Sequence, residues 1–94
     1  MKNDHLKLLI EAYELWGKKS QVLIALEEMA ELSKELLKNI NRSKNNETEI
    51  KDEIADVYIM LEQLKLMYNI SEDELIQLME NKLERLKTRL NKWF

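Results

Sequence analysis

The chain has 94 residues, 45% of them apolar, and a net charge of −3, which predicts one small domain spanning residues 1–94. With one glycine, no proline and no cysteine, it excludes a β-rich fold with many tight turns, a disulfide framework and a thiolate metal site. The acidic balance argues against a nucleic-acid partner. Because there is neither a membrane-spanning apolar run nor a signal-peptide-like segment, we expect a cytoplasmic protein that does not enter a membrane.

Two helices are predicted in the first half of the chain. From about Asp4 to Trp16, apolar side chains recur at steps of three and four, and Gly17 supplies the helix end. The second helix runs from about Ser20, its predicted N-cap, to Ile40. Its predicted core stripe consists of Val22, Leu26, Met29, Leu36 and Ile40, widened by Leu23, Ala30 and Leu37.

A polar segment follows and predicts the one long loop of the chain. It runs from Asn41 to Thr48 and is rich in Asn, Lys and Ser. Thr48 is the predicted cap of a third helix, from about Glu49 to Tyr68. The most regular apolar stripe of the chain lies on this helix and comprises Ile50, Ile54, Val57, Leu61, Leu64 and Tyr68.

The fourth helix has the clearest start signal. After a turn at 69–70, Ser71 and Glu74 form an S-x-x-E capping box, and the helix continues to about Asn91. The residues predicted to face inward are Leu75, Leu78, Met79, Leu83, Leu86 and Leu90.

The sequence therefore predicts an all-α protein of four helices. Because a chain of this size buries a modest share of its surface, and small scaffolds often gain burial by oligomerising, we expect a homodimer or a dimer of dimers, that is, a homotetramer. Trp93 and Phe94 at the end of the chain fit either a frayed tail or an anchor on a partner subunit.

Acidic residues are concentrated on the second and third helices in a pattern that does not favour helix stability. Glu27 and Glu31 form an i,i+4 pair of like charge, as do Glu49 and Glu53, and each such pair costs a helix a few tenths of a kcal/mol. A sequence selected for helix stability alone would mix the signs better. Two solvated acidic faces remain the alternative interpretation.

Four of these carboxylates are predicted to share one space. Glu28 and Glu31 are i,i+3 neighbours bordering an apolar ridge, and so are Glu53 and Asp56. The short loop makes their helices antiparallel neighbours. Four facing carboxylates would repel one another, and a divalent cation would remove that repulsion. An oxygen-only ligand set favours Mg²⁺, with Mn²⁺ as a possible substitute, over Zn²⁺.

Two segments carry a resemblance to a known family. The sequence EEMAE at 27–31, followed by EIAD at 53–56, resembles the E-E-x-x-E … E-x-x-D pattern of the MazG-like all-α nucleoside triphosphate pyrophosphohydrolases, a superfamily that includes dimeric dUTPases and dCTP pyrophosphatases. Trp16-Gly17, Gln21 and the segment KLER at 82–85 are also similar to the family. The resemblance spans about residues 10 to 90.

The resemblance implies a four-helix MazG-like bundle and a Mg²⁺-dependent hydrolase. The substrate would be a nucleoside or deoxynucleoside triphosphate, cut between the α- and β-phosphates to give the monophosphate and pyrophosphate. The implied metal ligands are Glu28, Glu31, Glu53 and Asp56. Glu27 would orient a ligand or a water molecule, unless it is a solvated surface residue.

The resemblance also implies contacts to the substrate. Lys82 and Arg85 lie three apart on the last helix and would hold the phosphates, or else belong to an ordinary basic surface. Trp16 would stack on the base, although its spacing also fits a core position. Gln21 would read the edge of the base, or cap the second helix.

One departure from the family keeps other functions open. Glu80 stands where larger members often carry an asparagine, two residues before the lysine of the last motif. A nucleotide-binding sensor that binds Mg²⁺ without turnover would tolerate this change. An acidic helical interaction module without catalysis is the other alternative.

Overall fold

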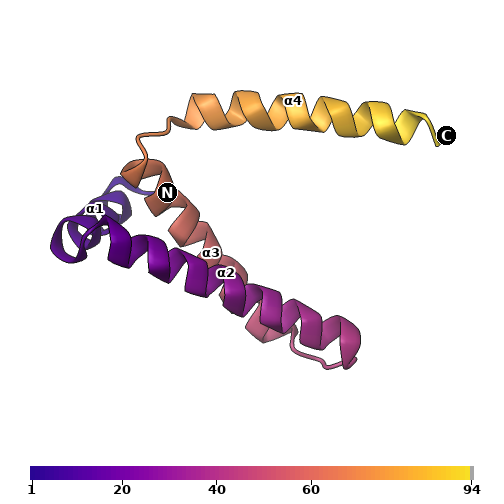
Figure 1. The fold of residues 1–94 in the computed structure, drawn as a ribbon, viewed down its shortest axis with the longest axis horizontal. Coiled ribbons are helices and arrows are strands. Elements are labelled where there is room, and N and C mark those ends of the chain that lie inside the picture. Colours follow the sequence, from indigo (N-terminus) through magenta and orange to yellow (C-terminus); the bar gives the residue numbers. More distant parts are fainter. Residues whose placement is uncertain (94) are drawn as a thin grey trace.

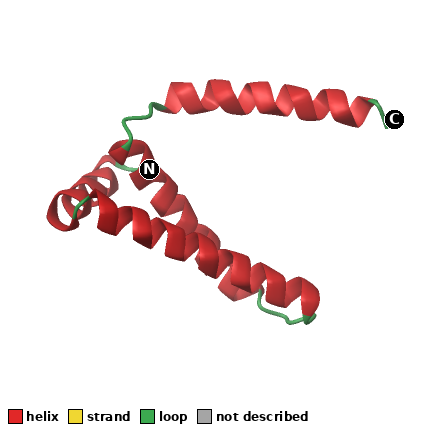
Figure 2. Ribbon diagram, in the orientation of Figure 1, coloured by secondary structure: helices red, strands yellow, loops and turns green. Residues whose placement is uncertain are grey.

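A computed structural model describes residues 1–93, so Phe94 of the predicted C-terminal anchor lies outside the described residues. Figures 1 and 2 show helices joined by short loops, and the described chain contains no strand. The all-α prediction with four helices is confirmed. No described helix is both long and apolar enough to cross a membrane. The helices are α1 (Asn3–Trp16), α2 (Lys18–Asn41), α3 (Glu47–Met67) and α4 (Glu72–Asn91).

The helices α2 and α3 form an antiparallel hairpin, and α1 packs across its open end. The side chain of Gln63 joins α3 to α1, because its Nε2 donates a hydrogen bond to the carbonyl oxygen of Leu9 at 3.2 Å. Gln63 is buried, and a buried amide that gained no such bond would cost free energy. This contact fixes α1 on the hairpin.

Gly17 is the single residue between α1 and α2. Its φ of 86° lies in a region that residues with a Cβ rarely adopt, and its N–H donates to the carbonyl oxygen of Tyr13. The predicted end of the first helix is confirmed. The predicted N-cap at Ser20 is wrong, because α2 resumes at Lys18 directly after the glycine bend and Ser20 lies inside its first turn.

The starts of α3 and α4 differ in how well the sequence predicts them. Thr48 is not the cap of α3, because the helix begins at Glu47 and Asn46 occupies the N-cap position. The capping box of α4 is confirmed. The Ser71 hydroxyl accepts the Glu74 N–H at 3.1 Å, and the Glu74 carboxylate accepts the Ser71 N–H at 2.8 Å.

The fourth helix stands apart from the other three in Figure 1, and no Cα atom of α4 lies within 8 Å of one in α1, α2 or α3. An ion pair between Lys65 and Glu72 links its start to α3. Apart from the half-buried Leu75, its predicted inward face is exposed, with Leu83 at 62%. The prediction that this face packs inward is therefore wrong for the single chain. A helical apolar stripe indicates that a face is covered, but not by what.

The core of the α1–α3 unit is small. The buried apolar residues of the described chain are Ala25, Met60 and Met67. On α2 the predicted core stripe is largely outside this core, since Leu26 is 56% and Ile40 is 74% exposed. The side of α2 that meets α3 carries buried Gln21 and Ala25 instead.

Candidate metal centre

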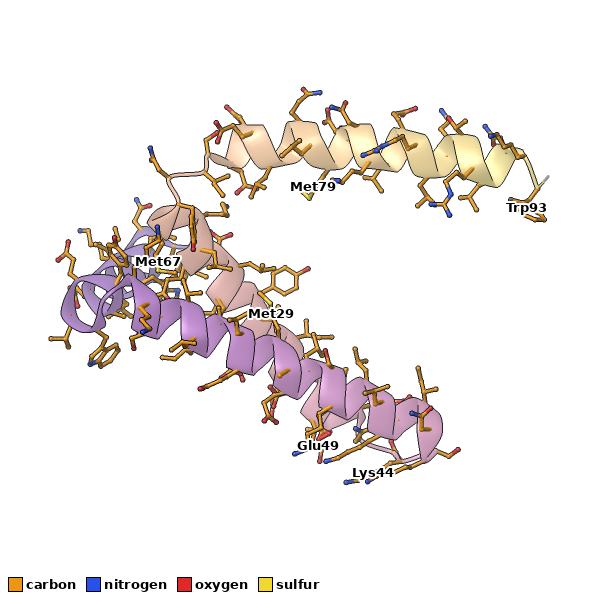
Figure 3. All side chains as sticks on the ribbon, viewed as in Figure 1. Met29, Lys44, Glu49, Met67, Met79 and Trp93 are labelled. Atoms are coloured by element: carbon orange, nitrogen blue, oxygen red, sulfur yellow. The ribbon has the colours of Figure 1, made fainter. Side chains whose placement is uncertain are left out.

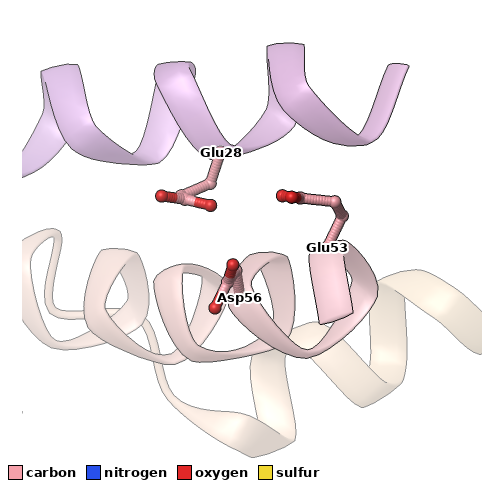
Figure 4. A group of neighbouring side chains, drawn as sticks. All are labelled: Glu28, Glu53 and Asp56. Atoms are coloured by element: carbon pink, nitrogen blue, oxygen red, sulfur yellow. The ribbon is translucent and has the colours of Figure 1, made fainter. Parts of the chain in front are cut away.

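Three carboxylates converge between α2 and α3. Figure 4 shows Glu28 reaching from α2 toward Glu53 and Asp56 of α3. One carboxylate oxygen from each lies within 4.8 Å of the others. Glu28 and Glu53 are half-buried and Asp56 is exposed. We refer to these three residues as the carboxylate cluster. Because its members come from both helices, the cluster shows that the α2–α3 hairpin brings the two acidic motifs together.

The two glutamates of the carboxylate cluster have raised pKa values. Burial raises the pKa of Glu28, and the facing charge of Asp56 raises it further. The pKa of Glu53 is also raised, first by burial and then by the charges of Asp56 and Glu31. These shifts arise because desolvation and like charges both disfavour the ionised form. A divalent cation would relieve both at once.

The donor set fits a hard cation. Mg²⁺ takes oxygen ligands at about 2.0–2.1 Å, so opposite ligands lie about 4.2 Å apart. The cluster oxygens lie within 4.8 Å of one another, so a small inward rotation of the side chains would suffice. One oxygen of Glu53 is buried without a hydrogen-bond partner, and a bound cation would satisfy it. We infer that the three residues could hold Mg²⁺ or Mn²⁺.

Glu31 and Glu27 border the carboxylate cluster without joining it. Glu31 is exposed, and its charge contributes to the raised pKa of both Glu28 and Glu53. It lies one turn from Glu28 on α2, and its carboxylate is not among those that converge within 4.8 Å, so the prediction that all four carboxylates share one space holds for three of them. Glu27 is exposed and lines a pocket on the α1–α2 corner.

That pocket also contains Trp16. It has a volume of about 480 Å³ and is lined by Trp16, Lys19, Ser20, Leu23, Ile24 and Glu27. Trp16 is 61% exposed, so it is not a core residue of the single chain. Glu27 precedes Glu28 in α2, but consecutive residues point about 100° apart around a helix, and none of the three cluster residues lines this pocket.

Three predicted substrate contacts are not brought to the carboxylate cluster within one chain. Gln21 is 4% exposed, with its Nε2 unpartnered, so it offers no edge to a base. It does not cap α2 either, because the N-cap position is Gly17. Lys82 and Arg85 are exposed on α4, which packs against none of the other helices.

Sequence reasoning missed a polar network at the closed end of the hairpin. The buried side chain of Asn46 donates to the Glu35 carbonyl oxygen at 2.9 Å and to its carboxylate at 3.2 Å. Asn39 donates to the Oδ1 of Asn46 at 3.2 Å. The bond from Asn46 lowers the pKa of Glu35. The cluster of asparagines in the predicted loop was the available signal, since asparagine side chains bond readily to nearby backbone.

Comparison of the chain with protein-family models, with curated proteins and with solved structures gives no match. The resemblance to the MazG-like superfamily therefore stays a prediction, carried by the acidic motifs and by the cluster they form.

Proposed function

We propose that the chain is a Mg²⁺-dependent nucleoside triphosphate pyrophosphohydrolase, which releases a nucleoside monophosphate and pyrophosphate. The observation that carries the proposal is the convergence of Glu28, Glu53 and Asp56 from two helices onto one space. Their types and positions match the two acidic motifs on which the family resemblance rests.

The carboxylate cluster would hold the metal, with Glu31 as a further ligand or as a partner of metal-bound water. When bound, Mg²⁺ neutralises charge on the phosphate oxygens and lowers the pKa of a coordinated water. In the reaction, the oxygen of water bonds to a phosphorus of the α–β anhydride, the bridging P–O bond breaks, and one proton is released. Catalysis of this kind depends mainly on positioning and charge stabilisation.

The pocket beside Trp16 is the proposed position of the base. An exposed indole offers an apolar face on which a nucleobase can stack. To reach the metal, the phosphates of a nucleotide stacked there would have to pass Glu27 and turn about 100° around α2 to Glu28. In this role Glu27 orients a water molecule beside the phosphates and does not bind the metal ion.

Lys82 and Arg85 are proposed to act on the carboxylate cluster of another subunit. Since α4 packs against none of the helices of its own chain, these two cations cannot hold phosphates at their own cluster in this arrangement. We propose a homodimer or a dimer of dimers, in which more than one chain lines each active site.

The test is product analysis on a panel of ribo- and deoxyribonucleoside triphosphates, with Mg²⁺ and with chelator. We expect monophosphate plus pyrophosphate with Mg²⁺ alone, at least about 100-fold loss of turnover for Glu53→Gln, and unchanged turnover for Glu14→Gln. Glu14 is an exposed glutamate on α1, outside the carboxylate cluster. Release of orthophosphate instead of pyrophosphate would contradict the proposed bond.

A nucleotide-binding sensor is the second candidate, favoured by the distance of Lys82 and Arg85 from the carboxylate cluster and by Glu80 in the last motif. It would show a Mg²⁺-dependent thermal shift with nucleotide but no product. A chain that responds to neither Mg²⁺ nor nucleotide would be an acidic interaction module.

A further inference from the structure

The junction between α3 and α4, residues 68–71, is built from two local motifs that follow each other directly. Asn69 has a φ of 54°, and the N–H of Ile70 donates to the carbonyl oxygen of Lys65 at 2.9 Å. This is the Schellman arrangement that ends a helix. The next residue, Ser71, opens the capping box of α4. The backbone at Ile70 and Ser71 is therefore where the direction of α4 is set.

An ion-pair network gives α4 a second connection to α3. The ammonium of Lys65, in the last turn of α3, lies 3.2 Å from the carboxylate of Glu62 and also pairs with Glu72 in the first turn of α4. The side chain of Lys65 is 17% exposed, so water screens these pairs less than it screens pairs on an open surface. We call Glu62, Lys65 and Glu72 the junction latch. Two connections, one through the backbone and one through the latch, fix the direction of a helix that one connection would leave free to rotate.

The junction latch lies at the end of an exposed apolar stripe on α3. Ile54, Tyr58 and Leu61 follow one another at steps of four and three, and Lys65 follows four residues later, so the four side chains share one face. The three apolar members are 40%, 68% and 44% exposed. A helix that folded back from the junction along this stripe would cover it.

The fourth helix has the apolar stripe that such packing needs, but it does not pack there. Leu83, Leu86 and Leu90 are 62%, 46% and 48% exposed, and Figure 3 shows Met79 and Trp93 with no other helix against them. Short connections between helices usually make them antiparallel neighbours. Here no Cα atom of α4 lies within 8 Å of one in α1, α2 or α3. The junction, and not the apolar stripes, therefore determines the direction of α4.

We propose that the junction latch holds α4 away from its own hairpin, with Lys65 as the positioning residue, and that α4 folds back along the exposed stripe of α3 when the latch opens. The latch acts on the proposed active site through α4, which carries Lys82 and Arg85. While it is closed, these two cations are kept from the carboxylate cluster of their own chain. This consequence rests on the proposed function, whereas the latch itself does not.

Two exposed lysines report the position of α4. Lys51 on α3 and Lys87 on α4 lie about 24 Å and about 23 Å from the junction along their helices, at a rise of 1.5 Å per residue. If α4 folded back along α3, their backbones would become neighbours about 10 Å apart, the distance between packed helices. The chain has no cysteine of its own, so Lys51→Cys combined with Lys87→Cys introduces just two sites for spin labels.

The test is the distance between these labels, measured by continuous-wave and pulsed EPR on the full chain without nucleotide. Labelled protein is diluted with an excess of unlabelled wild type, so that distances within one chain are measured. We expect a long distance with the latch intact, and a short-distance population that grows about three- to fivefold in Lys65→Met. Lys65→Arg should restore the long distance, because it keeps the ion pairs.

The matched control is Lys38→Met. Lys38 also pairs with a glutamate one turn earlier, Glu35 at 3.5 Å, but both residues lie within α2, so its loss should leave the label distance unchanged. Glu72→Gln breaks the bond across the junction at an exposed side chain and should reproduce Lys65→Met even if that variant fails to fold. Glu62→Gln leaves the bond between Lys65 and Glu72 in place and should keep most of the long distance.

Ionic strength provides an independent test of the junction latch. At 1 M salt, where charges are screened within about 3 Å, the short-distance population should grow in the latched chain but not in Glu72→Gln. Equal distance distributions for Glu72→Gln and the latched chain, or equal effects of Lys65→Met and Lys38→Met, would overturn the proposal. Because the distances are measured without nucleotide, a failure to release pyrophosphate would count against the proposed hydrolysis alone. If pyrophosphate is released, Lys65→Met should raise KM at least about twofold, and Lys65→Arg should restore it.

Discussion

At the scale of single residues, Glu28 shows how the carboxylate cluster opposes folding when no metal is bound. Its pKa is raised in the folded chain, by burial first and by Asp56 next. The folded state therefore holds its proton at pH values where the unfolded chain has released it. The contribution of Glu28 to stability is full below its unfolded pKa and is lost as pH rises through the higher folded value.

Replacing Glu28 with Gln should therefore stabilise the metal-free protein at neutral pH. The expected gain in the free energy of unfolding is a few tenths of a kcal/mol to about 1 kcal/mol, because a like-charge contact is removed. The gain should shrink as pH falls through the ordinary Glu pKa of about 4.3 and vanish near pH 3, where Glu28 is protonated in both states. Urea unfolding with chelator at pH 3 and pH 7.5 measures it. A gain of equal size at both pH values would show that the effect is not one of charge.

The affinity for Mg²⁺ should change with pH in the opposite sense to the metal-free stability. Because Glu28 and Glu53 have raised pKa values, protons compete with the ion, and the protein binds Mg²⁺ more tightly as those protons leave. Thermal shifts at fixed Mg²⁺ concentration should grow from pH 5 to pH 8. In Glu28→Gln the shift should be small at every pH. A shift in wild type that does not depend on pH would place the ion elsewhere.

The sequence was sufficient to predict the three cluster residues but not the surroundings of every candidate. Glu28, Glu53 and Asp56 could be found because i,i+3 spacing and a short loop leave few arrangements of two helices. The burial of Gln21 could not be predicted in this way, because it depends on where α1 packs. The angle between α1 and α2 is set by a single residue, Gly17. The positions of Lys82 and Arg85 depend on where α4 packs. The periodicity of α4 shows that one face is covered but does not specify which helix covers it.

At the scale of elements, the closed end of the hairpin is held by Asn46. Its side chain is 1% exposed and bonds to both the backbone and the carboxylate of Glu35. Since Glu35 lies in α2 and Asn46 precedes α3, these bonds fix how the two helices enter the loop. The register of the hairpin, and with it the approach of Glu28 to Glu53, depends on this end.

Removing the Asn46 side chain should destabilise the protein more than any change to the exposed loop. Asn46→Ala should lower the free energy of unfolding by about 1–3 kcal/mol, since it leaves buried polar groups unsatisfied. Asn45→Ala, at the exposed neighbouring position, should change it by less than about 0.5 kcal/mol. Urea unfolding of both variants at one protein concentration provides the comparison, and equal effects would refute the role of Asn46.

The helix starts show why local signals succeed or fail. The capping box of α4 is complete within four residues, so Ser71 and Glu74 predict the start correctly. The N-cap positions of α2 and α3 are occupied by Gly17 and the buried Asn46. Neither residue forms a side-chain hydrogen bond to the first turn of its helix. Ser20 and Thr48 are good caps by residue type, but the backbone bends before it reaches them.

At the scale of the whole molecule, the chain has more apolar surface than its own helices can cover. Sequence periodicity identified apolar stripes on all four helices, and the stripe of α4 is intact in the structure. What periodicity cannot specify is whether the covering helix belongs to the same chain, because an apolar face has the same pattern in both cases. The chain is elongated, 50 × 36 × 23 Å across, and these apolar faces are exposed in it.

If a second copy covers these faces, as in the proposed homodimer, stability must depend on protein concentration. Association stabilises the folded chain by mass action, so the midpoint of thermal unfolding should rise by several degrees between about 1 and 100 µM. Tyr58→Asp, in the exposed stripe of α3, should melt at a midpoint that is lower and independent of concentration, whereas Leu15→Asp, at an exposed position on α1, should follow the wild type. Circular dichroism at several path lengths covers this range. A wild-type midpoint that does not move would mean that the small α1–α3 core, with Ala25, Met60 and Met67 buried, suffices for the fold, and that the exposed stripes have another purpose.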